Sequence, residues 1–137
     1  MCFGAAVSSA QTFTVSGSPG ALAITTAIAG QPPTADVDAA TTYTVKAQNK
    51  NSPIKITARL SAAMPPGVTL TLSMAAPTGA TSNGPVTLDA TAREIVGNIT
   101  NTSGLTRSMT YTLSATAAAG VVAPQSRTVT LTVAAWP

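Results

Sequence analysis

The chain has 137 residues, enough for one domain of ordinary size, and 45% of them are hydrophobic. Only 8% are charged, the formal net charge is +3, and histidine is absent. The low charge content means that neutral hydroxyl and amide side chains must form most of the polar surface, and such a surface favours close packing against copies of itself. The lack of histidine excludes histidine-dependent catalytic triads and histidine metal sites.

A single cysteine, Cys2, excludes an internal disulfide framework and a multi-cysteine metal site. Seven basic residues against four acidic ones, with 4% aromatic residues, form neither the basic stripe nor the stacking platform of a nucleic-acid-binding protein. We therefore expect no nucleic-acid partner and no cofactor.

The first ten residues are small and apolar. Ser8 and Ala10 occupy positions at which small residues precede a signal-peptidase cut, so cleavage before Gln11 is consistent with the sequence. The segment has no basic start and is too short for a complete signal, so we interpret residues 1–10 as the remnant of a signal peptide of a secreted protein. The alternative is an ordinary floppy N-terminus. No run reaches the roughly 20 apolar residues of a membrane-spanning helix, and we expect no membrane span.

From Gln11 onwards, apolar and polar residues alternate with the period of a β-strand. The predicted strands share this alternation and fall near residues 12–15, 22–28, 42–47, 54–60, 68–74, 86–88, 109–115 and 129–133. Glycine, proline, asparagine and serine separate most of them. Many short strands with regular turns predict an all-β protein, an immunoglobulin-like antiparallel β-sandwich of about seven to nine strands. The sandwich domain is expected over residues 20–137, after an N-terminal strand and hinge at residues 11–19.

One segment carries a helical signal. Residues from Thr91 to Glu94 match a helix capping box, but Gly97 follows within a turn, so at most one helical turn is expected there. Asn98 and Asn101 each begin a match to the N-glycosylation acceptor pattern, which is common by chance in a chain rich in these residue types. We interpret that region as a polar loop.

Two motifs suggest chemistry and are set aside. Ser52 and Lys55 have the spacing of a nucleophile and base in penicillin-binding enzymes, but that pairing needs a helix, and here a turn followed by a strand is predicted. Asp36 and Asp38 could offer two carboxylates to a cation. Calcium needs six to eight oxygen ligands and no third acidic residue is near in sequence, so a solvated loop without a metal is expected.

Residues 41–60 are predicted to form a hairpin. Inward-facing residues match when the turn is centred on residues 50–51, and this register places Lys46 directly opposite Lys55 on the outer face. The cations near this hairpin are Lys46, Lys50, Lys55 and Arg59. They either prevent wrong pairing at a sheet edge or form a patch that meets an anionic partner, such as an acidic glycan or the carboxylates of a neighbouring subunit.

The first strand, residues 11–16, is separated from the rest by the glycine- and proline-containing hinge that starts at Gly17. It can fold onto its own sheet, or it can act as a donor strand along the open edge of the next subunit. The contact residues of such a donor strand are Thr12, Phe13, Thr14 and Val15. Burial of the two apolar side chains contributes about 1.5–3 kcal/mol each, and about four ladder hydrogen bonds contribute about 0.5–1.5 kcal/mol each.

A small-residue start ending at Ala10, the alternating strand from Thr12 to Val15 and a Thr-rich last strand from Thr128 to Val133 resemble bacterial fimbrial and spore-coat-U-like subunits. The resemblance extends over most of the chain from Gln11, and it lies in the general residue composition and strand alternation, not in a specific motif. It implies an extracellular fibre on the bacterial surface, a homopolymer built by donating an N-terminal strand to a neighbour. The chain differs from many such subunits in lacking a cysteine pair, and it holds enough predicted strands to fill a sandwich.

Two functions remain in competition. The first is a structural subunit of an extracellular filament, pilus or surface layer assembled by strand addition. The second is a monomeric secreted module that attaches to polysaccharide or a cell surface, which exposed aromatic side chains would favour. We do not expect an enzyme, because the four acidic residues are scattered along the chain.

Overall fold

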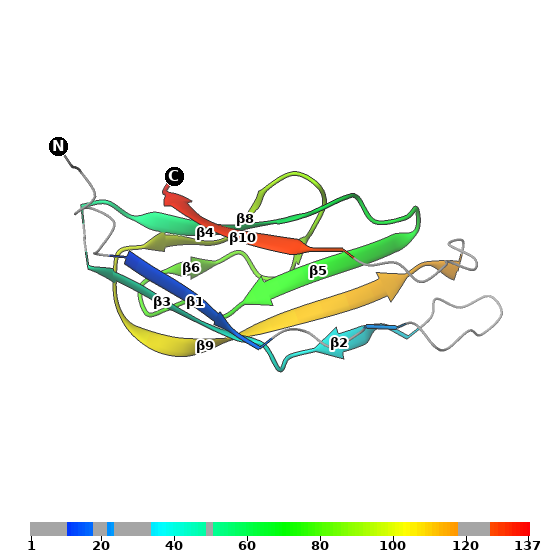
Figure 1. Cartoon of the computed structure of the whole chain (residues 1–137), viewed down its shortest axis with the longest axis horizontal. Helices are drawn as coiled ribbons and strands as arrows, with labels where there is room; N and C mark the ends of the chain where they lie inside the picture. Colours follow the sequence, from blue (N-terminus) through cyan, green and yellow to red (C-terminus); the bar gives the residue numbers. More distant parts are fainter. Residues whose placement is uncertain (1–10, 18–21, 24–33, 49–50, 118–126) are drawn as a thin grey trace.

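The structure is a computed structural model, and it describes residues 11–17, 22–23, 34–48, 51–117 and 127–137 (Figure 1). Within these ranges it contains ten strands in two antiparallel sheets and no α-helix. The strands are β1 (Gln11–Ser16), β2 (Asp36–Asp38), β3 (Thr42–Gln48), β4 (Ile54–Leu60), β5 (Val68–Met74), β6 (Thr81–Ser82), β7 (Val86–Thr87), β8 (Arg93–Ile99), β9 (Asn101–Ala115) and β10 (Val129–Ala135). The prediction of an all-β protein with two antiparallel layers is confirmed.

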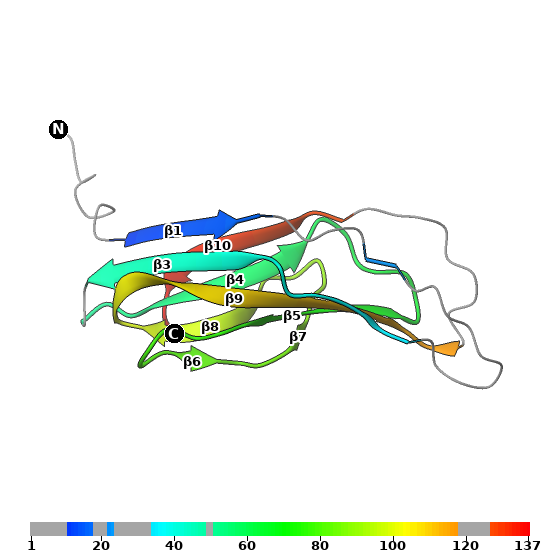
Figure 2. The same ribbon diagram turned by 90° about the horizontal axis from the view of Figure 1, so that it is seen from below.

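The chain changes sheet at every step after β3. One sheet has the order β1-β3-β9-β5-β7, with β2 also paired to β9, and the other has the order β10-β4-β8-β6. Figure 1 shows the two layers one above the other, and Figure 2 shows them face on, with the first sheet in front. The immunoglobulin-like form of the sandwich is not confirmed. In that fold the consecutive strands F and G are neighbours in one sheet, whereas the consecutive strands β9 and β10 belong to opposite sheets here.

The predicted hairpin over residues 41–60 is wrong. β3 pairs with β1 and β9, whereas β4 pairs with β10 and β8, so the chain crosses from one sheet to the other between them. Both strands still bury alternate residues, such as Val45 in β3 and Ile56 in β4. Alternating apolar residues meet the same core whether two strands pair within one sheet or face each other from two sheets. The pattern alone therefore did not distinguish the two arrangements.

Two strands lie where loops were expected. β2 includes both Asp36 and Asp38 and pairs with β9, and β8 pairs with β4 and β6. Asn98 belongs to β8, with a φ of 54°, a conformation that asparagine tolerates better than most residues. Asn101 begins β9. The region that was interpreted as a polar loop is thus the junction of two long strands.

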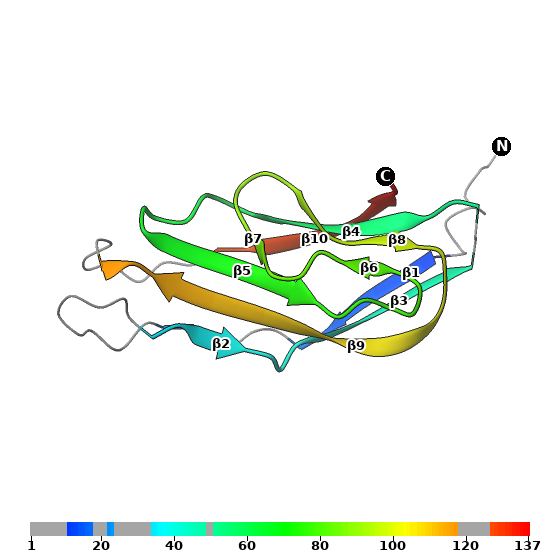
Figure 3. The ribbon, with the colours of Figure 1, turned by 180° about the vertical axis from the view of Figure 1, so that it is seen from behind.

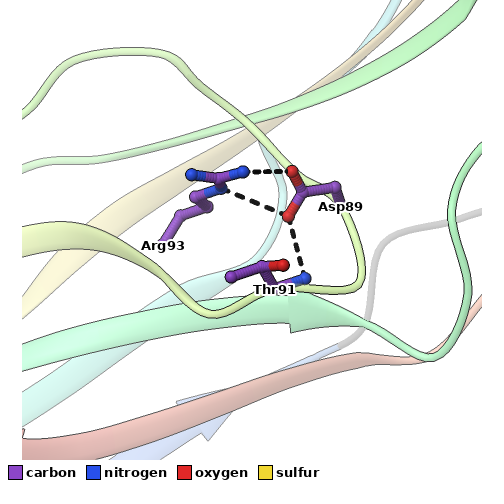
Figure 4. A network of polar contacts seen from close by, with 3 residues as sticks. All are labelled: Asp89, Thr91 and Arg93. Carbon is purple, nitrogen blue, oxygen red and sulfur yellow. Dashed lines mark hydrogen bonds and ion pairs between the residues drawn. The ribbon is translucent and has the colours of Figure 1, made fainter.

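No helical turn forms at Thr91. The carboxylate of Asp89 instead organises the entry to β8 (Figure 4). Its Oδ1 accepts hydrogen bonds from the Thr91 backbone N–H at 2.9 Å and from Arg93 Nε at 3.2 Å, and its Oδ2 forms an ion pair with Arg93 Nη2. The side-chain hydrogen bond from Arg93 holds the pKa of Asp89 below its usual value. The Thr91 N–H, which would be a free backbone donor in the first turn of a helix, is thus already bonded to the Asp89 carboxylate.

The core is aliphatic, with two buried tyrosines. Inward residues of β4 are almost fully covered: Ile54, Ile56, Ala58 and Leu60 are each 3% exposed or less. Tyr43 is completely buried, and its hydroxyl donates a hydrogen bond to the carbonyl of Ala75. The phenol thus has a partner for its one polar group, as buried tyrosines require.

The C-terminal end of β10 is fixed against the second sheet. The Trp136 N–H of the backbone donates to the Pro53 carbonyl at 2.9 Å. The indole lies over Gly97, where an added Cβ would be 2.6 Å from Trp136 Nε1 and 2.5 Å from Glu94 Oε2. The glycine therefore gives the indole room to cover β8, and this contact holds β10 in place.

The buried phenol of Tyr43 predicts a loss of stability in alkali. Burial raises the pKa of Tyr43 to about 12, although the positive charge of Arg107 acts in the opposite direction. Between about pH 10 and pH 12 the unfolded chain releases this proton and the folded chain keeps it, so the free energy of unfolding falls by about 1.4 kcal/mol per pH unit. Urea unfolding at about pH 9 and about pH 11 should show a smaller drop for Tyr43→Phe than for the wild type. Equal drops would contradict the assignment.

Candidate assembly surface at the edges of β1 and β10

The strands β1 and β10 are the outermost strands of the two sheets on one side of the sandwich (Figure 2). A groove lined by residues of both strands lies between them. Within the described ranges no strand pairs with the outer edge of either one. An edge strand presents alternate backbone N–H and C=O groups outwards, and these groups are a template for another strand. Two such edges therefore lie side by side.

The other side of the sandwich is protected against strand pairing. Its outermost strands are β6 and β7, which have two residues each (Figure 3). Pro85 precedes β7 directly, and Gly79 and Gly84 nearby have positive φ values. Very short edge strands and prolines are common means of preventing edge-to-edge association. By contrast, β1 and β10 have six and seven residues and contain no proline and no charged residue.

The groove between β1 and β10 has a volume of about 520 Å³. It is lined by Phe13, Val15, Gly17, Thr41, Tyr111, Arg127, Thr128, Val129 and Leu131. The inward-facing apolar residues of both edge strands are only partly covered; the side chain of Val15 is 38% exposed. The core thus remains open at this side, whereas the inward residues of β4 are sealed.

Thr41 lines the groove and carries a polar group that lacks a partner. The residue is 1% exposed, and its Oγ1 has no hydrogen-bond partner among the described residues. A buried hydroxyl without a partner costs about 1–3 kcal/mol, and native proteins rarely keep one. At the same side of the sandwich, Arg127 is held by hydrogen bonds from Nε and Nη2 to the Ala63 carbonyl, at 3.1 and 2.8 Å. The groove therefore combines apolar walls with an unsatisfied hydroxyl.

The predicted donor-strand residues pair within their own chain in this structure. Phe13 lies opposite Val45 and Val15 opposite Tyr43, and the Phe13 and Tyr43 ring centroids are 6.1 Å apart with their planes at 48°. Phe13 packs against the core cluster and is half-buried. Thr12 and Thr14 point outwards and are exposed. Pairing of β1 with a neighbouring copy stays a prediction.

The predicted cationic residues do not form one patch across a hairpin. Lys46 lies on the outer face of the first sheet, with Thr12 and Ser103 as its strand partners. Lys55 and Arg59 lie on the outer face of the second sheet, on the other side of the sandwich. Lys50 lies outside the described residues. The predicted opposition of Lys46 and Lys55 is wrong because their strands belong to different sheets.

The remaining candidate motifs are placed as follows. Asp36 Oδ2 accepts a hydrogen bond from the Ala23 N–H at 2.8 Å, and Asp38 Oδ1 accepts one from the Ala40 N–H at 2.9 Å. Among the residues that can be placed, no group of three or more His, Cys, Asp or Glu side chains is arranged to hold a metal ion. Ser52 lies in the turn before β4, and Lys55 lies within that strand. The segments predicted as signal remnant (1–10) and most of the hinge after Gly17 lie outside the described residues.

None of the described segments is a helix long and apolar enough to cross a membrane. Comparison with family models, curated protein sequences and solved structures finds no match to this chain. The fimbrial and spore-coat-U-like resemblance therefore stays a prediction that rests on the sequence.

The sequence indicated β1 as a possible contact strand, but it did not indicate that β10 and Thr41 lie beside it in the groove. The uncharged, alternating run of β10 was recognised as a strand, and its lack of protective residues could have marked it as an exposed edge. Nothing in the sequence indicated Thr41. Its burial and its unpaired hydroxyl arise only when β1, β9 and β10 meet around it.

Replacing Thr41 with valine should stabilise the isolated subunit. The substitution keeps the volume and removes a buried hydroxyl without a partner, so the free energy of unfolding should rise by about 1 kcal/mol. Urea unfolding of dilute protein measures this change. The matched control is Thr71→Val on the outer face of β5, which should change stability by less than about 0.5 kcal/mol. A loss of stability in Thr41→Val would show that the hydroxyl has a partner in the isolated chain.

Proposed function

We propose that this protein is a structural subunit of an extracellular polymer, such as a filament, pilus or surface layer of a bacterial cell. In this polymer β1 of one copy pairs with β3 of the next copy. The observation that carries the proposal is the concentration of long, uncharged, unprotected edge strands on one side of the sandwich, while the opposite side ends in two-residue strands. The proposal needs an open-sided sandwich and does not depend on immunoglobulin connectivity.

The β1–β3 ladder can form equally well within one chain or between two. It consists of six residue pairs, and all of them are reproduced when β1 of a neighbour takes the same position. Nineteen residues, 17–35, connect β1 to β2. Leu22 packs against the core and the Ala23 N–H donates to Asp36, so exchange of β1 also requires the release of these two contacts. Once they are released, at about 3.3–3.6 Å per residue the connection can span up to roughly 60 Å. Exchange of an identical element between copies is a route to association with a small free-energy difference.

The release of β1 from its own chain also requires little free energy. Phe13 is half-buried and Val15 is 38% exposed, so opening β1 exposes less new apolar surface than removal of a central strand would. Edge elements with few buried contacts open at low free energy compared with the whole domain. A released β1 leaves its own β3 free, and this edge can then accept the β1 of another copy. Repetition of that step gives an open chain of subunits.

The aromatic residues support the polymer over a polysaccharide-binding module. Tyr43 and Tyr111 are 0% and 4% exposed, and Trp136 and Phe13 are half-buried. Stacking on sugar rings needs exposed aromatic faces, and the described part of the chain presents none as an open platform. The proposed role is mechanical, with no reaction assigned to any residue.

A pair of cysteines can reveal which chain supplies β1. Thr12 and Lys46 are directly opposite each other on the outward face of the β1–β3 ladder, where opposed Cβ atoms are about 4.5–5.5 Å apart. In a Cys2→Ser background, Thr12→Cys combined with Lys46→Cys should form disulfides between chains when the protein is assembled and then oxidised. Non-reducing gel electrophoresis should show a ladder of covalent oligomers.

The control is Thr44→Cys combined with Thr106→Cys in the same background. Their hydroxyl oxygens are 3.4 Å apart between β3 and β9 of one chain, so this pair should cross-link within single chains only. Electron microscopy of negatively stained wild-type protein should show fibres. Intrachain cross-links alone for the Thr12 and Lys46 variant, with dispersed particles in the images, would disprove the proposal.

A further inference from the structure

The outer face of the first sheet is a continuous array of hydroxyl side chains. Serine or threonine occupies outward positions on β1, β3, β9, β5 and β7, and the strand registers align them in rows across the sheet. One row consists of Thr14, Thr44 and Thr106, and another consists of Thr87, Thr71 and Thr112 and ends at Val37 of β2, which is 56% exposed. We call this surface the hydroxyl face.

Charge is almost absent from the hydroxyl face. Among the described strand positions that point outwards from this sheet, the one charged side chain is Lys46, which lies beside Thr12 at one end. The outer face of the second sheet differs, because Lys55 and Arg59 project from β4. Lys55 and Arg59 are thus separated from the hydroxyl face by the thickness of the sandwich.

A neutral hydroxyl face is complementary to itself. Each hydroxyl is both a donor and an acceptor of hydrogen bonds, so two identical faces related by a two-fold axis can satisfy each other. The other face is not neutral, because it carries Lys55, Arg59 and, opposite Thr57, Glu94. We infer that the hydroxyl face is a contact surface for a second copy of this chain, and that it joins polymers side by side. This inference rests on the proposed function for the polymer itself.

The area of the face explains why the contact belongs to polymers and not to single molecules. The 37 residues of β1, β3, β9, β5 and β7, at about 3.3 Å per residue and about 4.8 Å between strands, give roughly 600 Å² per copy, or about 1,200 Å² for a pair. Stable interfaces between two proteins bury about 1,200–2,000 Å². One pair of faces is therefore only at the lower end of that range. Along a polymer the same contact repeats, and the repeats hold each other at a high effective concentration.

The test places one positive charge at the centre of either face. Thr71 is the middle residue of β5 on the hydroxyl face, and Thr57 is the middle residue of β4 on the opposite face; both are half-buried threonines in seven-residue strands. In electron micrographs of stained polymers, the wild type and Thr57→Lys should form lateral bundles, and Thr71→Lys should form single polymers. Raising the salt to about 1 M, where the Debye length is about 3 Å, should restore bundles in Thr71→Lys and leave the wild type unchanged.

Each other outcome identifies what has failed. Single polymers in the wild type, bundles in Thr71→Lys at low salt, or equal loss of bundles in both variants would overturn the hydroxyl-face contact while leaving the polymer intact. A complete absence of polymers would overturn the proposed function, and this contact with it. Binding of monomers to an insoluble polysaccharide, lost in Thr71→Lys and kept in Thr57→Lys, would assign the face to a glycan and overturn the contact between copies.

Discussion

Burial of alternate aliphatic side chains between two sheets stabilises this fold, and each sheet is built from strands that are distant in sequence. From β3 to β10 every strand lies in the opposite sheet from the one before it, and β4, whose Ile56 is fully buried, pairs with β8 and β10, which are both distant in sequence. Folds dominated by such non-local contacts form slowly, because loop-closure entropy is lost before the contacts form. β1 stands apart from this requirement. Phe13 packs against the core from an edge strand, so the release of β1 leaves the pairing of the other strands intact.

The two exposed edges on the open side differ in how firmly they are held. β10 is fixed at its end by the backbone hydrogen bond from Trp136 to Pro53 and by the indole that covers Gly97. β1 is joined to the domain by its ladder with β3 and, further along the chain, by the packing of Leu22 and the hydrogen bond from Ala23 to Asp36. In the proposed polymer, β10 would therefore stay with its own chain and β1 would be the strand that is exchanged. A contact made by donating β1 uses different surfaces on the two copies, and such head-to-tail contacts generate open chains when the rotation between copies does not close a ring.

The sequence predicted most strands correctly and their pairing poorly. Clean alternation located β3, β4, β5 and β10 because the two sheet faces differ in polarity at every second residue. β8 was missed because Ile95 and Val96 are buried in succession, next to irregularities in the β4–β8 register that break the two-residue period. The hairpin of Lys46 and Lys55 failed because alternation does not specify which strand lies alongside. The composition predicted a mostly neutral surface, but composition does not say where in the fold a side chain lies. Only the strand topology showed that the hydroxyls gather on one sheet and that Thr41 is buried without a partner.

Strand exchange and the hydroxyl face are geometrically linked. Thr14 on β1 lies beside Thr44 on β3, so an incoming β1 completes the hydroxyl rows of the copy that receives it. Each face in the polymer would then be built from two chains, yet its surface would be the same as that of a monomer whose β1 is in place. In the proposed polymer, strand exchange would add no new contact chemistry and would repeat a weak surface at fixed intervals. Because the strength of a repeated weak contact grows with the number of repeats that engage together, lateral association would depend on polymer length, and short assemblies would remain separate.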